Sequence, residues 1–170
     1  STSASGLSNK PGGSRSTRPY WSTGPCEGPL RCTTNPSCER SAQSRVRASA
    51  LTGRSWLNTG GEQLDWQKLR GKIVILDFWS FCCINCLHVL DELRPLEERF
   101  SDVLVTVGVH SPKFEHEADP DALAAAVERY AIEHPVLDDP ELTTWQAYSA
   151  RAWPTLVVVD PEGYIAAHLS

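Results

Sequence analysis

Two cysteines three residues apart are the residues of this sequence best suited to covalent chemistry: Cys83 and Cys86 enclose Ile84 and Asn85. If these residues begin a helix, the spacing brings the two Cα atoms to about 5 to 6 Å, within the range that a disulfide needs. The pair could then open and close as a disulfide without rearranging the backbone. This spacing predicts reversible thiol–disulfide exchange.

The elements on either side of the motif assign a role to each cysteine. Residues 73–79 form a short, branched apolar run typical of a buried strand, and Cys86, Leu90 and Leu93 then recur at helical spacing. The motif therefore lies where a strand enters a helix, and the positive end of a helix lowers a thiol pKa from about 8.5. We predict that Cys83 is the nucleophile and that Cys86, one turn later, is the resolving thiol.

Other interpretations of the cysteines remain open. Cys82, Cys83, Cys86 and His88 offer four zinc ligands, but such tight spacing can hardly wrap a tetrahedron. Inert core thiols are a second alternative, although three cysteines in five residues argue against packing alone. Cys82 is either a small residue in place of an aromatic one, which we prefer, or a second resolving thiol. We expect no metal and no bound cofactor.

Asp77 and Pro154 are the informative residues outside the motif. Asp77 interrupts a strand expected to be buried, and an unpaired buried carboxylate has a raised pKa, which suits a proton acceptor for a deep thiol. The alternative is an aspartate at a strand end that reaches solvent. Pro154 lies between Trp153 and Thr155, directly before a predicted strand, where proline occurs in tight turns and is occasionally cis.

Composition predicts one domain and a leader. A chain of 170 residues with 41% hydrophobic residues is long enough for one packed core. Residues 1–50, rich in Ser, Gly, Pro, Thr and Arg, are interpreted as a disordered or foreign leader, and residues 51–170 as the domain. Cys26, Cys32 and Cys38 match no common zinc spacing, and we interpret them as unpaired thiols, with metal binding or a local disulfide as alternatives.

Charge and hydropathy limit the partners. Residues 1–47 hold seven Lys and Arg against two Asp and Glu, whereas the remainder holds nine against nineteen. An acidic body without clustered basic residues disfavours nucleic acid. No apolar stretch approaches the roughly 20 residues that span a bilayer, and no secretory signal is visible, so we expect no membrane association and a cytoplasmic location.

Strand and helix patterns alternate through the predicted domain. This order predicts an α/β fold with a mostly parallel central sheet that ends in an antiparallel hairpin, formed around the turn at residues 160–163.

The combination of Asp77-Phe78-Trp79, Cys83-x-x-Cys86 and Trp153-Pro154-Thr155 resembles the thioredoxin superfamily over about residues 56–170. The resemblance implies that Asp77 assists the second cysteine and that Pro154 is cis and lies beside the dithiol, where neighbouring backbone pairs with substrate. Trp79, Trp153 and Pro154 are accordingly assigned to substrate binding. Residues 120–131 and 134–138 resemble the TlpA and AhpC/TSA branch.

Two further segments, residues 81–88 and 108–114, resemble the thioredoxin-like domain of NHL repeat-containing proteins, in which a β-propeller follows. By that resemblance the chain is a fragment that ends before the propeller and before the final helix of the fold.

The resemblance implies a thiol–disulfide oxidoreductase that acts on protein or small-molecule disulfides and is served by a dithiol electron donor. Ile84-Asn85 in place of Gly-Pro, and Cys82 in place of Trp, leave the direction of the reaction open. The alternative from another class is a redox-inert interaction module of a larger NHL-repeat protein. A thiol peroxidase is a weaker reading, because Ser80 fits the required pattern before Cys83 but Leu76 occupies its proline position.

Overall fold

The computed structural model describes residues 45–170. Most of the predicted leader, including Cys26, Cys32 and Cys38, lies outside the described residues. Residues 45–50, which the sequence assigned to that leader, pack against the end of the domain. The N–H of Ala48 donates to the carbonyl of Gly163 at 2.9 Å, and the N–H of Ile165 donates to the carbonyl of Val46 at 2.8 Å.

One six-stranded sheet organises the described chain, with strand order β1-β4-β3-β2-β5-β6. The strands are β1 (Ser55–Leu57), β2 (Ile73–Trp79), β3 (Leu104–His110), β4 (Val136–Asp138), β5 (Thr155–Val159) and β6 (Ile165–Leu169). The helices are α1 (Ile84–Arg99), the 3-10 turn η2 (Glu115–Ala118), α2 (Pro120–Arg129) and α3 (Thr143–Ala147). The predicted strand at residues 73–79 and the helix that follows the cysteine motif are both confirmed.

The sheet is mixed, which corrects the expectation of a mostly parallel one. Pairs β2–β3 and β3–β4 are parallel, whereas β1–β4, β2–β5 and β5–β6 are antiparallel. The connection from β4 to β5 holds only the five-residue helix α3 and makes no helical crossover of the kind that joins parallel strands. Strand β5 therefore starts beside the end of β2 and runs back along it. The α/β fold class and the closing hairpin β5–β6 are as predicted.

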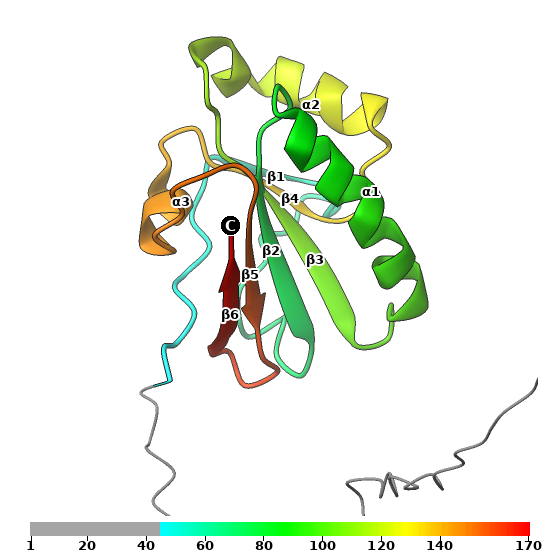
Figure 1. The fold of residues 1–170 in the computed structure, drawn as a ribbon, viewed down its shortest axis with the longest axis vertical. Helices are drawn as coiled ribbons and strands as arrows, with labels where there is room; N and C mark the ends of the chain where they lie inside the picture. Colours follow the sequence, from blue (N-terminus) through cyan, green and yellow to red (C-terminus); the bar gives the residue numbers. More distant parts are fainter. Residues whose placement is uncertain (1–44) are drawn as a thin grey trace, which may run out of the picture. The chain divides into compact units, whose positions relative to one another are not determined.

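Helices cover both faces of the sheet (Figure 1). Alternation along β2 directs Leu76 and Phe78 to the face covered by α3, where they pack with Trp145 and Tyr148. The opposite face, which carries Trp79, is covered by α1 and α2. Because β2 is flanked by β3 and β5 and covered on both faces, the segment that leaves its C-terminal end starts from a rigid support.

Within residues 45–170, none of the helices combines the length and the apolar character that crossing a membrane requires.

Candidate active site

Cys83 occupies the N-cap of α1, at the end of the short loop that leaves β2. Its backbone is extended, with φ −102° and ψ 104°, and its sulfur accepts the N–H of Cys86 at 3.4 Å. The first turn of α1 carries no acidic residue. A sulfur at this position faces the unpaired N–H groups of a helix N-terminus, and that turn carries no opposing negative charge.

Cys86 lies one turn into α1 and is completely buried against Trp79 and Leu90. Burial raises the pKa of the Cys86 thiol far above its ordinary value, and the neighbouring Cys83 sulfur raises it further. All three cysteines in the described part of the chain are free thiols. The two sulfurs of the motif therefore differ in environment: one is partly accessible at a helix end, and the other is buried and protonated at neutral pH.

Asp77 is buried in the middle of the sheet, which excludes the alternative of a strand-end aspartate in solvent. Neither carboxyl oxygen has a hydrogen-bond partner among the described residues. Burial, and then the negative charge of Glu97, raise the pKa of Asp77 to about 7. The charge of Asp77 in turn contributes to the raised pKa of Cys86. A carboxyl that titrates near neutrality thus lies within electrostatic reach of the buried thiol.

The peptide bond between Trp153 and Pro154 is cis, as the resemblance implied. Strand β5 begins one residue later, with Thr155 opposite Phe78, so Pro154 lies next to the end of β2 from which the cysteine loop departs. The Trp153 indole donates to the carbonyl of Ser111 at 2.8 Å and remains partly exposed. Trp153 and Pro154 therefore flank the site, where a bound chain could reach them.

Trp79 does not fit the substrate-binding role that the sequence assigned to it. Its side chain is fully buried beneath α1. It packs edge to face with the His110 ring, with 5.2 Å between the ring centroids. Alternation along β2 places it on the same face as Asp77, inside the core. Trp79 supports the site from below and cannot contact a substrate directly.

Glu117 is a residue of the candidate site that sequence reasoning missed. Its carboxylate is completely buried and accepts the Ser80 hydroxyl and the backbone N–H groups of Cys82, Lys113 and Phe114, the last three at 2.9, 2.7 and 2.9 Å. Burial alone would raise the pKa of Glu117, but these hydrogen bonds outweigh it and hold the pKa below its ordinary value. An ionised carboxylate thus ties the loop before Cys83 to the loop that follows β3.

Cys82 lies on the surface beside this anchor. Its sulfur is 3.4 Å from Nε2 of His116. The His116 ring stacks on the ring of Phe114, with 5.8 Å between the ring centroids. Partial burial of the sulfur and the nearby Glu117 carboxylate raise the pKa of the Cys82 thiol. This thiol lies outside the core, and its surroundings do not stabilise its anion.

No group of three or more His, Cys, Asp or Glu side chains suited to a metal ion occurs within residues 45–170. Cys82 points to His116, whereas Cys86 is buried in the core, so the four zinc ligands considered from the sequence are not brought together.

A family model described as thioredoxin-like matches residues 71–165, more than half of the chain. The chain therefore belongs to the thioredoxin-like family. This agrees with the strand–loop–helix geometry of the motif and with the cis proline beside it.

The known relatives of the chain include NHL repeat-containing proteins and thiol-disulfide oxidoreductases. It is 48% identical to NHL repeat-containing protein 2 of Gallus gallus over 110 residues, 64% of this chain and 15% of that protein. It is 28% identical to thiol-disulfide oxidoreductase YkuV of Bacillus subtilis over 116 residues, 68% of this chain and 77% of that protein. Among solved structures, thioredoxin-like superfamily protein SPOA0173 superposes with a TM-score of 0.66 at 28% identity, covering 72% of this chain and 84% of that one.

The chain spans only 11% to 16% of the length of the first curated relatives it matches.

Proposed function

We propose that this chain is a thiol–disulfide oxidoreductase in which Cys83 and Cys86 form the working pair. The observation that carries the proposal is the position of Cys83 at the N-cap of α1, with its sulfur accepting the N–H of Cys86. A partly accessible sulfur at a helix N-terminus can attack a disulfide, and a buried thiol one turn away can complete the exchange. Similarity to thiol-disulfide oxidoreductase YkuV supports the same class.

The reaction proceeds in two displacements. The Cys83 thiolate attacks one sulfur of a substrate disulfide and forms a mixed disulfide, while the other substrate sulfur leaves as a thiolate. Asp77 then accepts the proton of Cys86, whose sulfur attacks Cys83 and expels the second substrate thiolate. The products are a reduced substrate and a disulfide between Cys83 and Cys86. A dithiol donor restores the reduced enzyme by the reverse sequence of displacements.

Substrate would dock on the surface around Cys83. Ile84 and Phe114 are large apolar side chains with 64% and 50% of their surface exposed, and Trp153 is partly exposed. Pro154, also partly exposed, lies beside the end of β2 from which the cysteine loop departs. We infer that the substrate is a protein or small-molecule disulfide that presents apolar groups next to its sulfurs.

The second candidate is a redox-inert module that binds partners through the same surface. It is favoured by the 48% identity to NHL repeat-containing protein 2, a protein of which this chain spans 15%. In that case the apolar residues around Cys83 would serve binding alone, and the dithiol would have no turnover.

Reduction of insulin disulfides with a dithiol reductant separates the two candidates. The unsubstituted chain should accelerate the reaction above the reductant alone, and Cys83→Ser should abolish the acceleration. Cys82→Ser is the matched control, since it removes the adjacent thiol and should leave the rate within a few fold. A rate no higher than background for the unsubstituted chain supports the binding module, and an active Cys83→Ser variant refutes the assignment of the nucleophile.

A further inference from the structure

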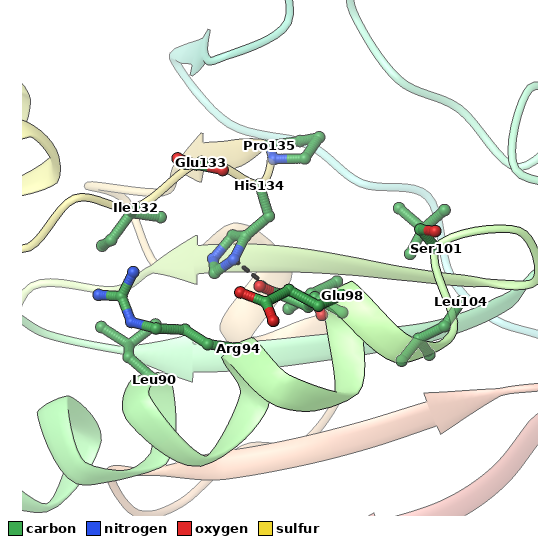
Figure 2. Close-up of a pocket in the computed structure, with 12 residues that line it drawn as sticks. Leu90, Arg94, Glu98, Ser101, Leu104, Ile132, Glu133, His134 and Pro135 are labelled. Atoms are coloured by element: carbon green, nitrogen blue, oxygen red, sulfur yellow. Dashed lines mark ion pairs between the residues drawn. The ribbon is translucent and has the colours of Figure 1, made fainter.

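A cavity of about 410 Å³ opens on the face of the sheet that α1 and α2 cover. It lies between the second half of α1, the start of β3 and the loop at residues 132–135 (Figure 2). Its walls carry polar and ionisable side chains, namely Arg94, Glu97, Glu98, Thr106, Glu133 and His134. Neither the attack by Cys83 nor the attack by Cys86 uses any of these groups directly.

His134 and Glu97 form a close pair in this cavity. Nδ1 of His134 lies 2.8 Å from Oε1 of Glu97, and Figure 2 shows the imidazole directed across the cavity toward α1. The two atoms are in ion-pair contact, and because a carboxylate oxygen can only accept, we assign the ring proton to Nδ1. Burial alone would raise the pKa of Glu97, but His134, Thr106 and the charge of Arg94 together outweigh burial and hold the pKa below its ordinary value. The ionised Glu97 thus leaves Nε2 of His134 as the proton acceptor.

The free nitrogen of His134 lies next to the strand position beside Asp77. Gly108 of β3 is the register partner of Asp77, and a Cβ at Gly108 would lie 3.1 Å from Nε2 of His134 and 3.0 Å from the indole nitrogen of Trp79. The missing side chain at Gly108 therefore lets the imidazole reach the sheet surface one strand away from Asp77, a spacing of about 5 Å. Nε2 of His134 and both oxygens of Asp77 are buried without a hydrogen-bond partner among the described residues.

We propose that His134 and Glu97 form a proton relay that connects Asp77 with solvent in this cavity. The inference rests on the proposed function, since it concerns the proton that leaves Cys86 when its sulfur attacks Cys83. Asp77 takes up that proton and passes it to Nε2 of His134. The imidazolium, stabilised by Glu97, releases its Nδ1 proton through Glu97 to water. Exchange with water in the cavity, which returns a proton to Nδ1 and removes the one on Nε2, restores the starting tautomer. No electrons move in these steps, and His134 and Glu97 return to their initial states.

The other charged groups around the cavity are engaged elsewhere or face solvent. Arg94 donates to the carbonyls of Tyr130 and Ala131. Glu98, on α1, is exposed. Glu133, on the facing loop, is exposed as well. Of these groups, Glu97 is the one whose charge raises the pKa of Asp77, and His134 is its ion-pair partner across the cavity.

Single-turnover reaction with dithiobis(nitrobenzoate), an aromatic disulfide whose thiolate is coloured, separates the two displacements. The full chain carries Cys→Ser changes at residues 26, 32, 38 and 82, so that only Cys83 and Cys86 react. Attack by Cys83 releases the first coloured thiolate, and attack by Cys86 releases the second. Glu97→Gln and His134→Gln remove the relay, and Glu98→Gln is the matched control at the exposed neighbouring position.

Both relay variants should leave the first release within about twofold and slow the second about tenfold near neutral pH, and the control should change neither. Added imidazole should restore the second release in His134→Ala, a recovery that a purely structural role of His134 would not produce. A second release that is unchanged in both folded relay variants would overturn the relay. Absence of a second release in the parent chain would instead refute thiol–disulfide exchange by this pair.

Nitrogen NMR of the unsubstituted chain tests the same relay if a variant does not fold. The ring of His134 should be protonated on Nδ1 at neutral pH, with Nε2 bare. Protonation on Nε2 alone would contradict the relay, because that nitrogen could then not accept the proton of Asp77.

Discussion

The carboxylate of Glu117 accepts the backbone N–H of Cys82 at 2.9 Å, although the two residues are 35 positions apart in the sequence. The same carboxylate accepts the hydroxyl of Ser80. Two of the residues that connect β2 to Cys83 are therefore fixed by one buried side chain from η2. Glu117 is a positioning residue, because it acts on the nucleophile through the loop that carries it.

Replacing Glu117 by glutamine should lower the free energy of unfolding by about 2 to 3 kcal/mol. The NH₂ group of the amide cannot accept a hydrogen bond, so some of the buried N–H and O–H groups that the carboxylate accepts would lose their partner. The pKa of Glu117 is lowered by folding, so its stabilisation is complete above the ordinary pKa of a glutamate and is lost as the pH falls through the lowered value. Urea denaturation measures the change. Glu115→Gln, at an exposed position of the same turn, should have little effect, and equal losses for both variants would contradict this role of Glu117.

Asp77→Asn should slow the attack of Cys86 on the mixed disulfide more than the first attack by Cys83. The neutral amide cannot take the proton from the buried Cys86 thiol, whereas Cys83 attacks without it. Rapid-mixing measurement of the two thiolate releases gives both rates. Equal slowing of the two steps would refute the role of Asp77 as proton acceptor.

The same substitution should stabilise the fold above pH 7. Folding raises the pKa of Asp77 from 3.8 to about 7, so between these values the folded chain holds a proton that the unfolded chain has lost. Stability attributable to Asp77 is complete below about pH 4 and falls as the pH rises to about 7. At about 1.4 kcal/mol per pKa unit, the penalty removed by Asp77→Asn is up to about 4 kcal/mol. Thermal melting at acid and alkaline pH tests this, with Asp102→Asn at an exposed position as the control. A stabilisation of the same size at pH 4 would show that the effect is not one of charge.

Cys82→Ser should leave turnover within a few fold. The sulfur of Cys82 lies on the surface against His116, whereas Cys86 is buried in the core. A disulfide between adjacent Cys82 and Cys83 would close a strained eight-membered ring, so it should be less populated. Mass spectrometry of the oxidised chain should show the linkage between Cys83 and Cys86. A dominant linkage between Cys82 and Cys86 would make Cys83 a bystander.

Local sequence patterns predicted the elements that hold the dithiol. The apolar run of β2 and the helical recurrence of Cys86, Leu90 and Leu93 are short-range signals, and both elements are present where expected. Burial of Asp77 followed from its place inside that run. The direction of β5 was harder to predict from the sequence. Strand β5 is antiparallel to β2 because the connection through α3 makes no helical crossover.

Contacts between distant loops could not be read from spacing. Glu117 reaches Cys82 because the loop after β3 folds over the end of β2, and His134 reaches Gly108 because β4 packs beside β3. The resemblance at residues 108–114 pointed to the loop after β3, but it did not indicate that Glu117, three residues further on, would hold the cysteine loop. Trp79, which the sequence assigned to substrate binding, is buried because β2 is covered on both of its faces.

Covalent trapping tests the central claim most directly. In Cys86→Ser the first displacement can occur but the second cannot, so a disulfide substrate should remain attached to the protein. We expect a stable mixed disulfide on Cys83, identified by mass spectrometry of the full chain after digestion and released by a dithiol reductant. An adduct found mainly on Cys82, or no adduct on either Cys82 or Cys83, would contradict the assignment of Cys83 as the nucleophile.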